Sequence, residues 1–153
     1  MHTRQVTVES PVGSLVVSER GGKIVALDWG TAVVESDTPV LAAAARQLNA
    51  YFYCELQRFD LPLAPAGTTF QQAVWKAMQA IPYGKTRSYA DLARQLDSGP
   101  RAIGGACGRN PMPILIPCHR VLASGDRIGG YTSPGGLETK RFLLQLEGAL
   151  RAA

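Results

Sequence analysis

The chain has 153 residues and a mass of 16.4 kDa, which fits one domain or two small ones. Its 46% hydrophobic and 18% charged residues are typical of a globular protein and exclude a disordered one. It has neither the roughly 18-residue apolar run of a membrane span nor the apolar segment of a signal peptide near its N-terminus. Three cysteines do not suit a secreted disulfide framework, so we expect a cytoplasmic protein.

The net charge of +4 is unevenly distributed. Residues 1–66 carry five basic and seven acidic side chains, a balance of −2, whereas residues 67–153 carry 11 basic and five acidic ones, a balance of +6. The basic half either faces a polyanion or has an ordinary charged surface, and charge alone leaves both interpretations open.

The first part of the chain predicts a small α/β domain. Residues 3–9, 15–18 and 24–29 are β-rich and separated by Gly- and Pro-containing turns, which predicts a three-stranded antiparallel sheet. Residues 40–52 have apolar side chains at helical spacing and predict a helix. Residues 61–67 hold two prolines and a glycine and predict a linker, which gives domains 1–66 and 67–153.

The second part is predicted to be mainly helical, so the whole chain is classed as α+β. Helices are expected over 70–80, 89–96, 101–107 and 137–150, with Thr68 or Thr69, Ser88 and Pro100 at the first three starts. The helices around the turn 97–99 form a helix-turn-helix pattern. Three prolines in 110–119 predict a stiff, extended path, and 121–134 predicts a loop.

Small residues occupy the interior of the helix over 101–107. Gly104 and Gly105 each cost about 1 kcal/mol relative to Ala, and Ala106 follows them. Small side chains allow close approach, either to another helix or to a DNA groove flanked by Arg101 and Arg109. This segment alone does not decide between the two.

Cys118 is the candidate nucleophile, because His119 follows it directly and could take the thiol proton. Neighbouring side chains do not generally face each other, so the pair needs turn geometry or a bridging water. Glu147 is the best candidate for orienting the base. Considered by itself, Cys118 is better interpreted as a small buried hydrophobic residue. The rigid proline-rich segment around it favours a catalytic role instead, because a nucleophile needs a fixed position. Cys54 and Cys107 are interpreted as packing residues.

The pattern of cysteines and histidines predicts no metal site, because metal-ligand spacings such as CxxC and HxxxH are missing. Phosphate-binding Gly-rich motifs are also missing, so no cofactor is expected.

The run Pro117-Cys118-His119-Arg120-Val121, together with the preceding residues 110–116, resembles the active-site signature of the O6-alkylguanine-DNA alkyltransferases, also named methylated-DNA–protein-cysteine methyltransferases. The resemblance includes residues 88–89, 101–106, 136–137 and 143–148. It is strong over about residues 68–148, and over 1–66 it rests on overall layout only.

The resemblance implies irreversible, single-turnover DNA repair, in which Cys118 takes the alkyl group of O6-alkylguanine in double-stranded DNA. It implies that His119 deprotonates Cys118 through water, that Glu147 orients His119 and that Asn110 braces the turn. It also implies a winged helix-turn-helix-like core that binds the minor groove through helix 101–107. The implied base and DNA contacts are Tyr89, which rotates the nucleotide, Arg101, which fills the gap in the stack, and Gly104, Gly105, Ala106, Val121, Tyr131, Thr132 and Ser133.

Some features depart from the family pattern. Cys107 stands where many relatives have a larger hydrophobic residue, and the loop 131–136 is slightly longer than in some members, so the base pocket could differ. The chain lacks the N-terminal zinc ligands of some members, and we expect no zinc. Residues 1–66 are assigned a supporting role by default. A monomer is expected, and cooperative binding along DNA is left open.

Three alternative functions fit the sequence less well than this family does. Alkyltransferase-like proteins, which bind DNA without transfer, have tryptophan in place of Cys118. A cysteine hydrolase could use the same three residues but needs neither a helix-turn-helix nor a basic half. An alkylation-responsive transcription regulator would need a further DNA-binding domain, for which this chain is too short.

Overall fold

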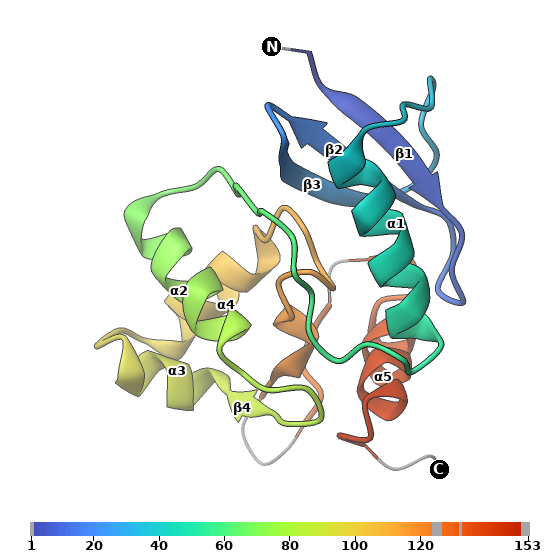
Figure 1. Ribbon diagram of the computed structural model, residues 1–153. Coiled ribbons are helices and arrows are strands. Elements are labelled where there is room, and N and C mark those ends of the chain that lie inside the picture. The colour runs from blue at the N-terminus through green and yellow to red at the C-terminus, as the bar shows by residue number, and fades with distance from the viewer. Residues whose placement is uncertain (1, 124–126, 132, 151–153) are drawn as a thin grey trace. The chain divides into compact units, whose positions relative to one another are not determined.

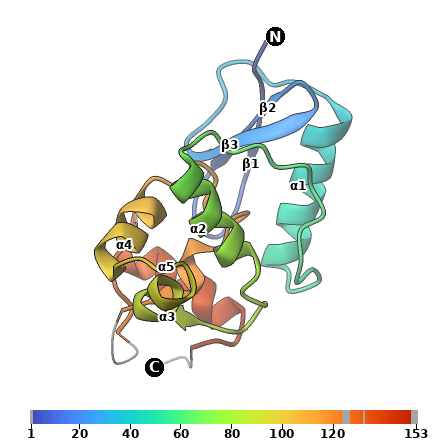
Figure 2. The same cartoon turned by 90° about the vertical axis from the view of Figure 1, so that its left-hand side faces the viewer.

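A computed structural model describes residues 2–123, 127–131 and 133–150 (Figures 1 and 2). The chain divides into two compact units with the boundary between residues 66 and 67. Within the part of the chain that is described, no helix is both long and apolar enough to cross a membrane.

The first unit contains the predicted three-stranded sheet. Strands β1 (Arg4–Val8), β2 (Leu15–Arg20) and β3 (Lys23–Trp29) pair antiparallel in the order β1-β2-β3, which confirms the meander. β2 runs two residues further than predicted, and its register with β3 shifts between Ser18 and Glu19. Such a local irregularity carries no sequence signal as strong as period-two alternation.

Helix α1 (Pro39–Phe52) supplies the other half of this unit's core. The helix begins where the Thr38 side chain accepts a hydrogen bond from the amide of Leu41 at 3.1 Å. Its buried side chains follow helical spacing and contact the sheet; they are Leu41, Ala44, Leu48 and Tyr51. This one apolar stripe therefore explains why residues 39–52 fold as a helix on the sheet (Figure 1).

The proline-rich segment 61–67 is more than the linker that its composition predicted. Ile24 donates its amide to Pro62 O, and Ala64 donates to Ile24 O, both at 2.8 Å. Leu63 thus forms a parallel bridge with Ile24 at the edge of β3. Prolines lack an amide donor but still accept hydrogen bonds, so they are tolerated at a sheet edge.

The second unit begins with three helices at the predicted places, α2 (Thr69–Gln79), α3 (Tyr89–Gln95) and α4 (Pro100–Gly108). α2 and α3 each start with a reciprocal capping box, formed by Thr68 with Gln71 and by Ser88 with Asp91. Trp75 donates its indole N–H to Ala106 O at 2.9 Å, which ties α2 to α4 inside the core.

The segment around Cys118 differs most from expectation. Residues 110–119 are not extended: the Ile116 amide bonds to Met112 O at 2.9 Å, and Ile114 has a φ of 78°. A 3₁₀ turn, η1 (Cys118–Arg120), follows. Prolines exclude a regular helix but not successive tight turns, which is why composition alone predicted the wrong path.

Strand β5 (Val121–Leu122) lies in the predicted loop 121–134, and it pairs parallel with β4 (Arg87–Ser88). Two-residue strands are too short for a sequence pattern to reveal. This pairing places the chain directly after η1 beside the start of α3.

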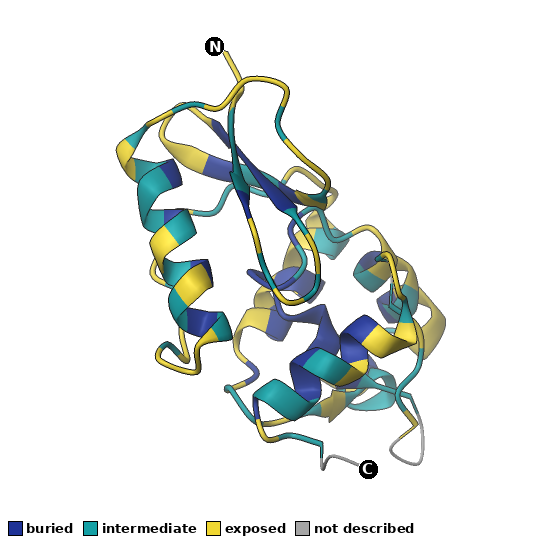
Figure 3. Ribbon diagram, turned by 90° about the vertical axis from the view of Figure 1, so that its right-hand side faces the viewer, coloured by how far each residue is buried: buried dark blue, intermediate teal, exposed yellow. Residues whose placement is uncertain are grey.

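Helix α5 (Leu137–Leu146) ends four residues earlier than predicted, and Glu147 is its C-terminal cap residue. The left-handed Gly148, at a φ of 75°, turns the chain out of the helix. Leu143 and Leu144 are buried, and Figure 3 shows the buried positions gathered inside the second unit.

Candidate active site

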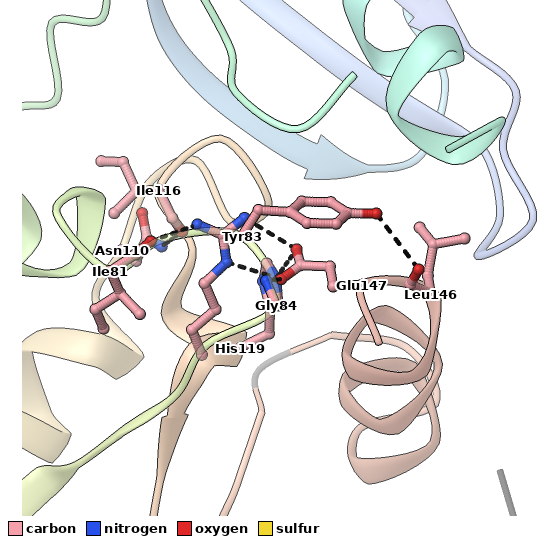
Figure 4. Close-up of polar contacts among 9 residues, drawn as sticks. Ile81, Tyr83, Gly84, Asn110, Ile116, His119, Leu146 and Glu147 are labelled. Carbon is pink, nitrogen blue, oxygen red and sulfur yellow. Dashed lines mark hydrogen bonds and ion pairs between the residues drawn. The ribbon is translucent and has the colours of Figure 1, made fainter. Parts of the chain in front are cut away.

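Cys118 opens the 3₁₀ turn η1 and is buried, with 8% of its surface exposed. The turn before it is braced by Asn110, whose side-chain amide donates to Ile116 O at 2.9 Å (Figure 4). The same side chain accepts a hydrogen bond from the Met112 amide at 3.0 Å. A third hydrogen bond joins the Cys118 amide to Ile116 O at 2.8 Å. The sulfur therefore follows a backbone segment that several hydrogen bonds hold in place.

His119 and Arg120, the next residues in η1, both bind the carboxylate of Glu147. His119 Nε2 lies 2.7 Å from Glu147 Oε2, and Arg120 donates from Nε to Oε1 at 2.9 Å and from Nη2 to Oε2 at 3.0 Å. All three residues are buried. The structure thus brings His119 and Glu147 of the predicted site together, with Cys118 next to His119 in the same turn, and adds Arg120.

The pairing with Glu147 orients the imidazole of His119. A carboxylate only accepts hydrogen bonds, so Nε2 carries the proton and Nδ1 keeps its lone pair. Nδ1 is buried and has no hydrogen-bond partner among the described residues. Burial, the largest influence, lowers the pKa of His119, which favours the neutral imidazole that a base requires.

A short turn before β4 holds Glu147 from another side. The Gly84 amide makes a long contact of 3.4 Å with Glu147 Oε1, and the Tyr83 hydroxyl donates to Leu146 O at 3.4 Å (Figure 4). Gly84 has a φ of 78°, and a Cβ there would lie 3.1 Å from Glu147 O. Both the conformation and the close approach therefore favour glycine.

The surroundings of Cys118 act on its thiol in opposite directions. Burial raises its pKa, while hydrogen bonds with Asn110 and Tyr131 and the charge of Lys140 lower it. Lys140 is buried, donates from Nζ to Val121 O at 2.7 Å and Gly130 O at 3.2 Å, and has a pKa lowered to about 8 by burial. Because burial dominates for the thiol, Cys118 needs a base to become a thiolate.

Two tyrosines belong to the same cluster. The Lys140 ammonium lies 5.8 Å from the ring centroid of Tyr89, and burial raises the pKa of Tyr89 to about 12. Burial, followed by the charge of Cys118, also raises the pKa of Tyr131. Both hydroxyls are therefore protonated at neutral pH and can donate hydrogen bonds.

Cys107 makes the packing contact expected of it and also interacts electrostatically with Cys118. Its sulfur is 3.6 Å from Met78 Sδ, and burial followed by the charge of Cys118 raises its pKa to about 12. Sequence reasoning also missed Arg120, Gly84 and Lys140. Lys140 is a charged position of the last helix, a residue type that is usually exposed, but its side chain is buried.

The open face of α4 carries Arg101, Gly104 and Gly105. Arg101 is exposed in the first turn, and a Cβ at either glycine would meet nothing within 4 Å among the described residues. Packing against another helix of this unit therefore does not explain the glycines. Ala106, by contrast, is buried.

The other expected base contacts lie after η1. Val121 is buried, and the Ser133 hydroxyl donates to Pro134 O at 3.1 Å. Thr132 lies outside the described residues. Among the described residues, no group of three or more His, Cys, Asp or Glu is arranged to hold a metal ion.

Comparison with known proteins gives the same family along both units. Residues 4–65 match the ribonuclease-like domain of 6-O-methylguanine DNA methyltransferase, and residues 69–149 match its DNA-binding domain. The chain belongs to the 6-O-methylguanine DNA methyltransferase family. This membership confirms the fold class predicted from the sequence.

Individual relatives cover nearly the whole chain. The methylated-DNA–protein-cysteine methyltransferase of Methanosarcina acetivorans is 42% identical over 92% of this chain and 96% of its own length. A crystal structure of Mycobacterium tuberculosis O6-methylguanine methyltransferase superposes with a TM-score of 0.85 at 40% identity, covering 99% and 96% of the two chains. A crystal structure of Mycobacterium tuberculosis OGT in complex with DNA superposes with a TM-score of 0.85 at 42% identity. The match covers 97% of this chain and 94% of that chain.

The burial of Cys118 makes its reactivity depend on pH. We expect iodoacetamide at pH 7 to label the exposed Cys54 before Cys118, and labelling of Cys118 to accelerate as pH rises past the usual range of thiols, because burial raises its pKa. Peptide mass mapping after timed labelling measures both sites in one sample, with Cys54 as the internal control. Rapid labelling of Cys118 that does not change with pH would instead indicate a preformed thiolate.

Proposed function

We propose that this protein repairs DNA by direct reversal, transferring the alkyl group of O6-alkylguanine in double-stranded DNA to Cys118. The observation that carries the proposal is the buried cluster of Cys118, His119 and Glu147 in a unit that belongs to a DNA-binding family domain. The relatives named as methylated-DNA–protein-cysteine methyltransferases support the same chemistry.

In the proposed reaction, His119 Nδ1 takes the proton of the Cys118 thiol through a water molecule. The thiolate then attacks the alkyl carbon, so that a carbon–sulfur bond forms while the bond from carbon to guanine O6 breaks. The electron pair goes to the guanine, and the protonated Tyr89 hydroxyl is the donor that stabilises this leaving group. A thioether is stable, so each molecule acts once.

Guanine O6 lies on the pairing edge, inside the stack, and a protein sulfur reaches it only after the nucleotide flips out. We assign Arg101, exposed at the start of α4, to the gap that flipping leaves. The open face at Gly104 and Gly105 would let α4 approach the minor groove closely. We propose that Tyr131 and Ser133 border the flipped base together with Val121.

The remaining proposals concern the roles of the two units, the oligomeric state and the cellular location. We propose that the unit of residues 1–66 supports the DNA-binding unit of residues 67–153, that the protein acts as a monomer, and that it works in the cytoplasm. The balance of +6 over residues 67–153 suits a DNA partner.

Mass spectrometry of the intact protein tests the transfer directly. After incubation with a duplex that contains one O6-methylguanine, we expect a stoichiometric gain of one methyl group, mapped to Cys118. Cys118→Ala should gain none and still bind the duplex, because the sulfur contributes to chemistry rather than to the DNA-binding surface. Methyl transfer by Cys118→Ala would refute the assignment. A wild-type protein that neither gains mass nor binds would favour a cysteine hydrolase.

The open glycines predict opposite effects on stability and DNA binding. Gly104→Ala and Gly105→Ala should each raise the free energy of unfolding by up to about 1 kcal/mol, because alanine favours the helix and the new methyl groups meet nothing in the chain. The same variants should bind duplex DNA more weakly. Denaturant unfolding and fluorescence anisotropy measure the two quantities, and transfer from free O6-methylguanine is the control that should not change. Tighter or equal DNA binding would argue against contact at this face.

Arg101→Ala tests the role in base flipping. We expect transfer from duplex DNA to slow by at least about tenfold, since unstacking costs a few kcal/mol that an inserted side chain offsets. Transfer from the free base should keep its rate, and stopped-time assays on the two substrates give the comparison. Equal losses on both substrates would show that Arg101 acts on the chemistry or the fold instead.

A further inference from the structure

Arg120 makes contacts beyond its ion pair with Glu147. Its Nε and Nη2 bind the two carboxylate oxygens of Glu147 as a fork, and its Nη1 donates to Ile81 O at 2.7 Å. Its guanidinium also lies 5.9 Å from the ring centroid of Tyr83. The side chain is only 9% exposed. Arg120 is therefore fixed by contacts that do not involve His119.

This arrangement sets the charge balance around His119. The groups that act on the imidazole are Glu147, Arg120 and Lys140, with Cys118 adjacent in the chain. Arg120 and Glu147 cancel each other, so a neutral His119 adds no charge to the buried pair. A protonated His119 would add a positive charge that both Arg120 and Lys140 oppose.

Removing the charge of Arg120 would leave a buried carboxylate with His119 as its nearest partner, and such a pair takes up a proton more readily. If the proton goes to the imidazole, Nδ1 is protonated. If it goes to Glu147, the carboxyl donates to Nε2, and the imidazole proton moves to Nδ1. Nδ1 loses its lone pair in both cases, so it can no longer accept the proton of Cys118.

We propose that Arg120 is a positioning residue that keeps Glu147 ionised and His119 neutral with its proton on Nε2, so that Nδ1 is available as the base for Cys118. The effect of Arg120 on activity rests on the proposed alkyl transfer. The protonation state of His119, however, can be measured whether or not the protein transfers alkyl groups. The fork geometry matters as well as the charge, because a lysine cannot bind both carboxylate oxygens in the same plane.

The experiment measures the titration of His119 by NMR in Arg120→Gln and Arg120→Lys. His119 is one of two histidines, and His2→Gln in every sample leaves its imidazole signals unambiguous. We expect the midpoint of proton uptake to rise by at least about one pH unit in Arg120→Gln, with ring ¹⁵N shifts that report a proton on Nδ1, and by less in Arg120→Lys. Arg141→Gln, which removes an exposed arginine on α5, is the matched control and should leave the midpoint unchanged.

The pH profile of alkyl transfer gives the second readout. The rate of Arg120→Gln should fall on the acid side at a higher pH than that of the parent, with a loss of about tenfold for each unit that the midpoint rises, and should recover toward the parent rate at alkaline pH. A role confined to folding would reduce the rate equally at every pH and would leave the His119 midpoint unmoved, which would overturn the proposal. If Arg120→Gln does not fold, the Arg120→Lys midpoint decides in the same way. A parent protein that transfers no alkyl group would refute the proposed function, while the NMR titration would still decide the role of Arg120.

Discussion

A buried carboxylate is the constraint on which the second unit depends. Isolated ionised carboxylates cost several kcal/mol to bury, and the cost is offset only when the lone pairs are satisfied. Glu147 meets this condition with donors from Arg120, His119 and, more weakly, Gly84. These residues come from η1 and from the turn before β4, so the carboxylate joins segments that lie more than 25 residues from it in the chain. Loss of any one donor therefore disturbs several segments together.

The same network makes the reactivity of Cys118 conditional. Burial favours the thiol over the thiolate, so the sulfur is a weak nucleophile until a base acts on it. In the proposed mechanism, the base His119 is available only while the Arg120–Glu147 pair, joined by two hydrogen bonds, stays ionised. For a residue that is consumed by one reaction, as the proposed function requires, low resting reactivity limits wasteful alkylation. The stability of the fold and the low resting reactivity of Cys118 thus depend on the same ion pair.

Local sequence patterns predicted the elements that depend on local physics. Capping side chains at Thr68 and Ser88 and the apolar stripe of α1 located the helices to within a few residues. Contacts between distant segments were not predictable in this way. The β4–β5 pair, the burial of Lys140 and the pairing of Arg120 with Glu147 arise from tertiary packing, which overrides the polar character of a single position. Cys118, His119 and Glu147 were predicted as a set from their residue types, the proline-rich segment around Cys118 and the family resemblance, whereas an arginine beside a histidine carries no distinct signal.

In helix α4, residues that lower the stability of the helix point to an external partner. Glycines in a helix interior give up stability that alanine would provide, and in natural proteins such choices are commonly compensated elsewhere. The described part of this chain offers no compensation at Gly104 or Gly105, because a methyl group at either position would touch nothing. The buried Ala106 on the opposite side is explained by packing, since Trp75 binds its carbonyl.

The two sides of one short helix therefore follow different requirements. The inner side packs against the core, and the outer side is best explained by a partner surface that must approach the backbone closely. A DNA groove is such a surface, and the exposed Arg101 at the start of the same helix supplies the positive charge that it attracts.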